Sequence, residues 1–93
     1  MILHSYGNVN SIKKYYKGEY HMFFQRLKDL REDKQLLQDD IAKLLGIQQT
    51  VYSRYERGFQ PIPVKHLLTL ANFYKTSTDF ILGRTNNPKP PIQ

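Results

Sequence analysis

The sequence predicts an all-α fold: one compact domain of five short helices with a flexible tail at each end. Apolar residues recur every three or four positions in several segments, which is the spacing of a helix face that packs into a core. Glycine and proline residues separate these segments where a helix must end. A chain of 93 residues can bury one small hydrophobic core and no second one.

The first helix is expected over residues 23–34. Phe23, Phe24, Leu27 and Leu30 lie at helical spacing and would form its apolar face. Two leucines at positions 36–37 would close the connection to the next helix. This helix is therefore expected to pack against those that follow.

Residues 38–58, QDDIAKLLGIQQTVYSRYERG, predict two helices joined by a tight turn. Ile41, Leu44 and Leu45 fall on one face of the first of these helices. Gly46 is expected to end it, because glycine adopts the left-handed backbone of a helix terminus without steric cost. The chain should therefore turn sharply at this residue.

The second of these helices is expected at about residues 48–57. Tyr52 and Tyr55 are three residues apart and continue the inward stripe. Polar residues occupy the other faces: Gln49, Thr50, Ser53, Arg54 and Arg57. Glutamine can pair with adenine, arginine with guanine, and threonine or serine with bases or phosphates. This surface is suited to reading DNA.

The next helix is expected to begin near Pro63 and to run to about Tyr74. Pro61 and Pro63 prevent the preceding helix from continuing, and proline is well suited to a first helical turn. The inward stripe is expected to contain Leu67, Leu70, Ala71 and Tyr74, widened by Leu68 and Phe73. A solvated face is expected to carry Lys65, His66 and Lys75.

A fifth, short helix is expected before Gly83. Thr76 or Ser77 can cap its first turn, and Thr76 with Asp79 fits a capping box. The apolar residues 80–82 would either form a dimer surface or close the core of the monomer. The sequence leaves these two alternatives open.

The expected organisation is an N-terminal extension at residues 1–21, a helical domain at 22–84 and a disordered C-terminal tail at 85–93. The extension lacks a helical period and mixes tyrosines with lysines, so it is either a mobile tail or a basic arm that lies along DNA. Met22 directly precedes the first patterned helix, so a second hypothesis places the natural start there.

Composition excludes several classes of protein. There is no cysteine, which excludes disulfides and cysteine-ligated zinc and favours a reducing cytoplasm. No apolar run approaches the roughly 20 residues of a membrane span, so no membrane partner is expected. The formal charge of +6 favours a polyanionic partner, although it is also compatible with a merely soluble surface.

Neither a metal site nor catalysis is expected. His4, His21 and His66 are scattered without the spacing of metal ligands. Asp39 and Asp40 are adjacent and do not share a helical face as a catalytic pair, and no nucleophile with a positioned base is visible. We therefore expect no enzyme activity and no cofactor.

The order of helices, together with the glycine turn, the segment YSRYERG and the downstream LLTLANFYKTSTDFILG, resembles the phage-repressor and Cro-type (XRE-like) helix-turn-helix family. The resemblance covers about residues 23–84. It implies a lambda-repressor-like domain that binds operator DNA as a homodimer and regulates transcription, most often as a repressor.

The resemblance also implies roles for individual residues. Gln38 falls at the position that contacts a DNA phosphate from a helix N-terminus, where exposed N–H groups suit an anion. Arg31 and Glu56 fall at the positions of a structural ion pair. Base-facing or groove-facing positions are occupied by Gln49, Thr50, Ser53 and Arg54. From their charge, Lys43 and Arg57 are expected to bind the DNA backbone.

Three residues depart from the family pattern. Gln48 lies where serine or threonine often caps the recognition helix, and glutamine caps less well. Tyr52 is bulky for a buried position, and its hydroxyl needs a partner or access to the surface. Val51 would either contact a thymine methyl or pack locally.

Two functions are compatible with these features. The first is a sequence-specific DNA-binding regulator that acts as a dimer. The second is a protein-interaction module, such as an antitoxin that binds a partner protein and regulates its own operon. The second function would need a binding segment in residues 1–21 or in the PKPP tail.

Overall fold

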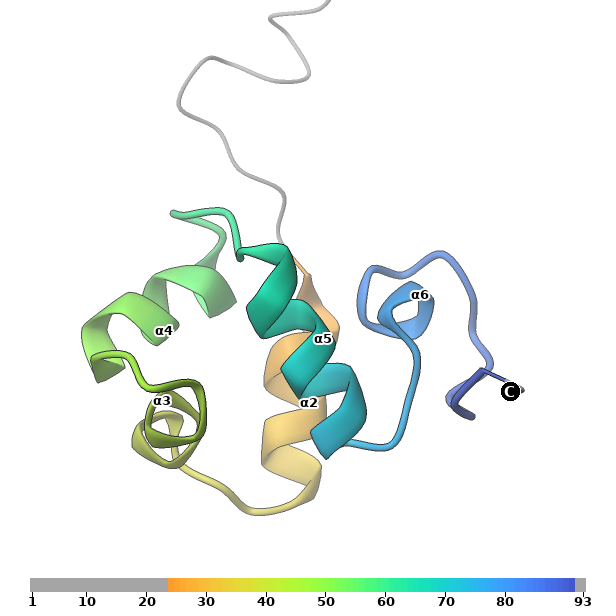
Figure 1. Cartoon of the computed structure of the whole chain (residues 1–93), viewed down its shortest axis with the longest axis horizontal. Helices are drawn as coiled ribbons and strands as arrows, with labels where there is room; N and C mark the ends of the chain where they lie inside the picture. The colour runs from red at the N-terminus through yellow and green to blue at the C-terminus, as the bar shows by residue number, and fades with distance from the viewer. Residues whose placement is uncertain (1–23, 92–93) are drawn as a thin grey trace, which may run out of the picture.

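The computed structural model describes residues 24–91. Within this range the fold consists of five α-helices and no strand, as the sequence predicts (Figure 1). The helices are α2 (Gln25–Asp33), α3 (Gln38–Leu45), α4 (Gln49–Arg57), α5 (Val64–Phe73) and α6 (Thr78–Ile81). None of the helices in residues 24–91 has the length and apolar character needed to cross a membrane.

Helices α2 and α5 form the centre of the molecule (Figure 1). The α3–α4 pair lies on one side of them and α6 on the other, and α2 contacts both α4 and α6. The core between these helices is formed by Leu27, Ile41, Ala42, Tyr52, Tyr55, Leu67, Leu70, Ala71, Tyr74 and Ile81. Most of the residues predicted to form apolar helix faces therefore lie in the core, and those of α4 hold this helix at the edge of the domain.

The turn between α3 and α4 has the predicted geometry. Gly46 has a left-handed backbone with φ of 71°. Its N–H donates to the carbonyl of Lys43 over 3.2 Å, and the N–H of Ile47 donates to the carbonyl of Ala42 over 3.0 Å. Ile47 then packs against the core. This paired closure of a helix end fixes the direction in which α4 departs from α3.

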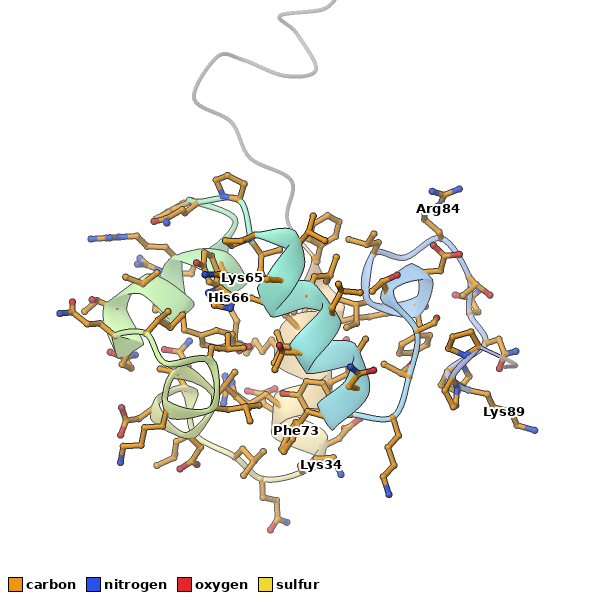
Figure 2. The ribbon with its side chains drawn as sticks, viewed as in Figure 1. Lys34, Lys65, His66, Phe73, Arg84 and Lys89 are labelled. Carbon is orange, nitrogen blue, oxygen red and sulfur yellow. The ribbon has the colours of Figure 1, made fainter. Side chains whose placement is uncertain are left out.

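Two expectations about α5 are wrong. His66 is buried instead of solvated, because it lies four residues before Leu70 on the inward stripe. Figure 2 shows it between α5 and α4, where its ring centroid is 6.2 Å from that of Tyr55. Leu68 and Phe73 are on the exposed side and do not widen the core.

Of the two caps expected for α6, Ser77 is confirmed, and the capping box of Thr76 with Asp79 is wrong. Ser77 caps α6, and its hydroxyl accepts a hydrogen bond of 2.9 Å from the N–H of Phe80. Thr76 is buried, and its N–H donates to the carbonyl of Ala71 over 2.9 Å. Thr76 therefore belongs to the closing turn of α5.

At least one residue of the apolar stretch 80–82 packs in the core of the monomer. Ile81 is 1% exposed and packs in the core, whereas Phe80 and Leu82 are half-buried. The Phe80 ring lies 4.0 Å from the guanidinium of Arg26 on α2. Burial of Ile81 favours the core-closing alternative at that position.

Arg26 also holds the segment that follows α6. Its guanidinium donates to the carbonyls of Phe80 and Thr85 and to the side-chain oxygen of Asn86. Residues 85–91 contain no helix or strand and are mostly exposed. The predicted domain boundary and the flexibility of the tail stay predictions, and the extension at residues 1–21 lies outside the described residues.

We predict that Gly46→Ala lowers the free energy of unfolding by about 1 to 2 kcal/mol. No atom lies within 4 Å of a β-carbon built at this position, so the cost comes from the left-handed backbone and not from a clash. Urea denaturation measures the change. Gly46→Asn should cost less than alanine, because asparagine tolerates this backbone better. Equal costs for the two variants would contradict the conformational explanation.

Candidate nucleic-acid interface

Helix α4 has one face in the core and one in solvent. Tyr52 and Tyr55 are 0% and 4% exposed, and their rings meet edge to face with centroids 6.2 Å apart. On the outer side, Gln49, Thr50 and Arg54 are exposed and Ser53 is half-buried. The two tyrosines thus anchor α4, which lies at the edge of the domain (Figure 1), and its polar residues face away from the core.

A buried ion pair joins α4 to α2. Nε of Arg31 lies 2.6 Å from Oε2 of Glu56, and a second guanidinium nitrogen donates to Oε1 over 3.0 Å. The third guanidinium nitrogen donates to the carbonyl of Leu36 over 2.8 Å. The two side chains are 11% and 3% exposed, so water competes little for these bonds. The structure thus brings together the two residues that the family resemblance assigns to an ion pair.

The environment of Glu56 favours its charged form. Burial by itself raises the pKa of this carboxyl, but the hydrogen bonds from Arg31 and Gln38 outweigh that effect and hold the pKa below its ordinary value. Glu56 is therefore an ionised carboxylate at neutral pH, and it balances the charge of Arg31.

Gln38 connects this ion pair to the start of α4. Its Nε2 donates to Oε1 of Glu56 over 3.1 Å, and its Oε1 accepts from Nε2 of Gln49 over 2.6 Å. A continuous series of hydrogen bonds therefore runs from Arg31 through Glu56 and Gln38 to Gln49. Gln49 keeps its Oε1 and one N–H, the acceptor and donor that a glutamine uses on adenine.

Lys43 and Arg57, the two cationic residues expected to contact the DNA backbone, differ in their local partners. Lys43 lies 3.2 Å from Asp39 in an exposed ion pair on α3. Arg57 is exposed and forms no ion pair within residues 24–91; its guanidinium lies 4.7 Å from the ring centroid of Phe59. Asp40 accepts the N–H of Leu37 over 2.8 Å, so it satisfies the start of α3.

The residues that depart from the family pattern have distinct environments. Gln48 is at the cap position of α4 and makes no side-chain capping bond, as expected for glutamine. The Tyr52 hydroxyl is buried and has no hydrogen-bond partner among residues 24–91, so the expectation of a partner or surface access is not met there. Burial and the nearby Glu56 carboxylate raise the pKa of this hydroxyl. Val51 is half-buried against the core, which favours local packing.

A hollow lies beside the end of α4 and the start of α3. It is open to solvent, has a volume of about 660 Å³ and is lined by Gln25, Lys28, Arg31, Glu32, Gln38, Glu56, Arg57 and Phe59. Lys28 and Phe59 carry no functional assignment from the sequence. The detectable signal for Phe59 is its position directly after the glycine that ends α4.

The residues from 24 to 91 bring together no group of three histidine, aspartate or glutamate side chains that could hold a metal ion. His4 and His21 lie outside this range. Burial and the neighbouring Lys65 lower the pKa of His66, which packs on Tyr55.

Two helices joined by a glycine turn, with the second presenting a polar outer face, define a helix-turn-helix DNA-binding domain. The family described as Helix-turn-helix (HTH_3) matches residues 27–81. The chain belongs to this family of transcriptional regulators.

Known relatives agree with this assignment. The chain is 36% identical over 72 residues to the HTH-type transcriptional regulator YobD of Bacillus subtilis (strain 168), which covers 77% of the chain and 64% of YobD. It is 34% identical over 53 residues to the cryptic phage CTXphi transcriptional repressor RstR of Vibrio cholerae, which covers 57% of the chain and 48% of RstR. The chain thus spans about half to two thirds of these relatives.

A solved structure also matches the fold. The crystal structure of a transcriptional regulator from Listeria innocua superposes with a TM-score of 0.64 at 26% sequence identity. The match covers 73% of this chain and 64% of the other. The helical arrangement is therefore shared with a transcriptional regulator.

We predict that Arg31→Ala lowers the free energy of unfolding by about 3 to 5 kcal/mol, because it leaves the buried carboxylate of Glu56 without its ionic partner. Denaturant unfolding measures the loss. Replacing both residues, as in Arg31→Met with Glu56→Leu, should cost less than Arg31→Ala alone. A larger loss in the double variant would contradict this explanation.

We also predict a specific acid dependence. The folded pKa of Glu56 is lowered, so its contribution to stability is fully present above the ordinary glutamate pKa of about 4.3 and is lost as pH falls through the folded value. Unfolding measured from neutral pH downwards should show this loss in the natural chain and not in Glu56→Gln. Glu32→Gln, an exposed control on α2, should keep the natural dependence. A similar acid profile in both variants would exclude Glu56 as the source.

Proposed function

We propose that this chain is a sequence-specific DNA-binding regulator, most simply a repressor, that inserts α4 into the major groove of an operator. The observation that carries the proposal is the polar outer face of α4, whose first residue is oriented by hydrogen bonds from the buried ion pair. An oriented side chain loses less conformational entropy when it meets a base. The relative RstR is named a repressor, which supports the same direction of regulation.

In this proposal, base reading is assigned to Gln49, Thr50, Ser53 and Arg54. Gln49 is suited to adenine and Arg54 to guanine, and the two hydroxyl side chains suit bases or nearby phosphates. Backbone contacts are assigned to Gln38, Lys43 and Arg57. Gln38 keeps one N–H for a phosphate after its bond to Glu56.

The proposed assembly on DNA is a homodimer. One recognition helix covers only a few base pairs, so two copies are needed on half-sites about 10 base pairs apart or multiples of that spacing. The partners in this proposal are thus double-stranded DNA and a second copy of the chain.

The proposal is tested by selecting duplexes from a random library with the purified chain at two salt concentrations. Recovery of a motif with two-fold symmetry supports a dimeric operator-binding protein. Motif-free retention that disappears with salt contradicts the proposal, because it reports charge alone. In that case, capture of partner proteins with and without residues 1–21 tests the protein-interaction alternative.

We predict that Arg54→Ala relaxes the selected motif at one position and weakens binding there by roughly 1 to 3 kcal/mol, because a bidentate guanine contact is lost. Repeating the selection with the variant measures this change. Arg84→Ala is the matched control, since Arg84 is an exposed arginine beyond α6, away from α4 (Figure 2). An unchanged motif would exclude Arg54 from base reading.

We predict that Lys43→Ala weakens binding to all DNA sequences alike. The slope of log affinity against log salt concentration should become shallower by about one unit, because one phosphate contact is lost. Asp39→Asn is the complementary variant. It should strengthen binding, because it releases Lys43 from its ion pair and removes a negative charge beside the DNA. Titrations of duplex DNA at several salt concentrations measure both effects. Weaker binding by Asp39→Asn would contradict the assignment of Lys43.

A further inference from the structure

Phe59 is an exposed aromatic residue directly after the glycine that ends α4. Gly58 has φ of 73°, and the N–H of Phe59 donates to the carbonyl of Arg54 over 2.9 Å. In this type of helix ending, an apolar side chain after the glycine commonly packs back on the helix. Phe59 is instead 63% exposed, so core packing does not account for its aromatic ring.

The ring of Phe59 holds the guanidinium of Arg57. The central carbon of that guanidinium lies 4.7 Å from the ring centroid, within the range of a cation–π contact. Nε of Arg57 also donates to the carbonyl of Ser53 over 3.4 Å. These two contacts hold Arg57 at the end of the proposed recognition helix, and neither neutralises its charge.

The charge around this pair favours an anion. Arg57 and Phe59 line the hollow between α2, the start of α3 and the end of α4, with Lys28 in the same lining. In the lining, the charges of Arg31 and Glu56 neutralise each other. The remaining charged residues are the cations Lys28 and Arg57 and the anion Glu32, so the net charge of the lining is positive. Neither Lys28 nor Arg57 has an ion-pair partner among residues 24–91.

We propose that Phe59 is the positioning residue for a DNA-backbone contact made by Arg57. A guanidinium stacked on an aromatic ring keeps the N–H groups of its two terminal nitrogens free for a phosphate. The ring restricts the long arginine side chain before DNA arrives, so less conformational freedom is lost on binding. This inference rests on the proposed DNA binding and adds a residue that does not itself read bases.

The test is a double-mutant cycle on duplex DNA with Arg57→Ala, Phe59→Ala and the double variant. We expect Phe59→Ala to weaken binding about two- to fivefold, the size of an exposed cation–π contact. The same substitution should have no effect when Arg57 is already alanine. Arg57→Ala should also make the slope of log affinity against log salt concentration shallower by about one unit, the effect of one lost phosphate contact. Equal effects of Phe59→Ala in both backgrounds, or none in either, would overturn the inference.

Two conservative variants separate ring electrostatics from bulk. Phe59→Tyr keeps the aromatic face and should bind like the natural chain, whereas Phe59→Leu keeps apolar bulk and should bind like Phe59→Ala. The midpoint of thermal unfolding should be unchanged in these two variants and in Phe59→Ala, because the ring is exposed. A loss of binding that follows a lowered midpoint would assign Phe59 a merely structural role.

Arg84 supplies the control cycle. This arginine lies beyond α6 in Figure 2 and faces Asp79 at 3.9 Å. Phe59→Ala should therefore weaken binding by the same factor with or without Arg84→Ala. Coupling of Phe59 to Arg84 as large as its coupling to Arg57 would overturn the positioning role.

A measurement without DNA tests the contact itself. The δ-methylene protons of Arg57 should show ring-current shifts in the NMR spectrum of the natural chain and of Phe59→Tyr, and should lose them in Phe59→Leu. Unshifted protons in the natural chain would overturn the inference.

The experiments also separate this inference from the proposed function. A backbone contact does not depend on sequence, so the cycle is run on both a selected motif and a mixed-sequence duplex. Coupling on the mixed duplex without any selected motif would refute the sequence-specific regulator and support the positioning role. A selected motif without coupling would do the reverse, and no binding to either duplex would refute both.

Discussion

The buried ion pair between Arg31 and Glu56 is the constraint on which the orientation of α4 depends. Helix α4 is short, and few helices surround it in a domain of this size. A bidentate arginine–carboxylate pair fixes distance and direction together, which apolar contacts alone do not. Such a pair does not necessarily add net stability, because both charges lose hydration. Its effect here is to set the geometry of α4 relative to α2.

The same pair orders Gln49, the first residue of α4. Glu56 accepts from Gln38, and Gln38 accepts from Gln49, so a side chain in solvent is oriented from the core. Gln48 contributes no capping bond that would fix this end of α4. The α3–α4 turn and this series of hydrogen bonds together position the helix start.

The charges on this side of the domain are not equivalent. Lys43 is paired with Asp39, whereas Arg57 stacks on Phe59 and has no acidic partner within the described residues. On the other side of the molecule, Arg26 is occupied by the end of α6 and by the segment after it. The formal charge of +6 therefore does not say which side chains are available to an anion, because local contacts decide which cationic groups are free.

The sequence by itself determined the helical framework. The glycine turn at Gly46, the inward positions of Tyr52 and Tyr55 and the five helices follow from contacts between residues three or four positions apart. Such contacts are repeated along a helix, so their pattern is readable without knowing the fold. The family resemblance also indicated the partners in the ion pair of Arg31 and Glu56.

The tertiary structure alone decided how polar side chains are used. It enclosed His66, and by enclosing Thr76 it decided between the two caps that the sequence allowed for α6, in favour of Ser77. It also left the apolar ring of Phe59 exposed. It also joined Gln38 to Gln49, and Arg26 to residues 54 to 60 positions away. A polar side chain bonds to whichever group the packed helices bring within about 3 Å, and local periodicity carries no information about that distant neighbour.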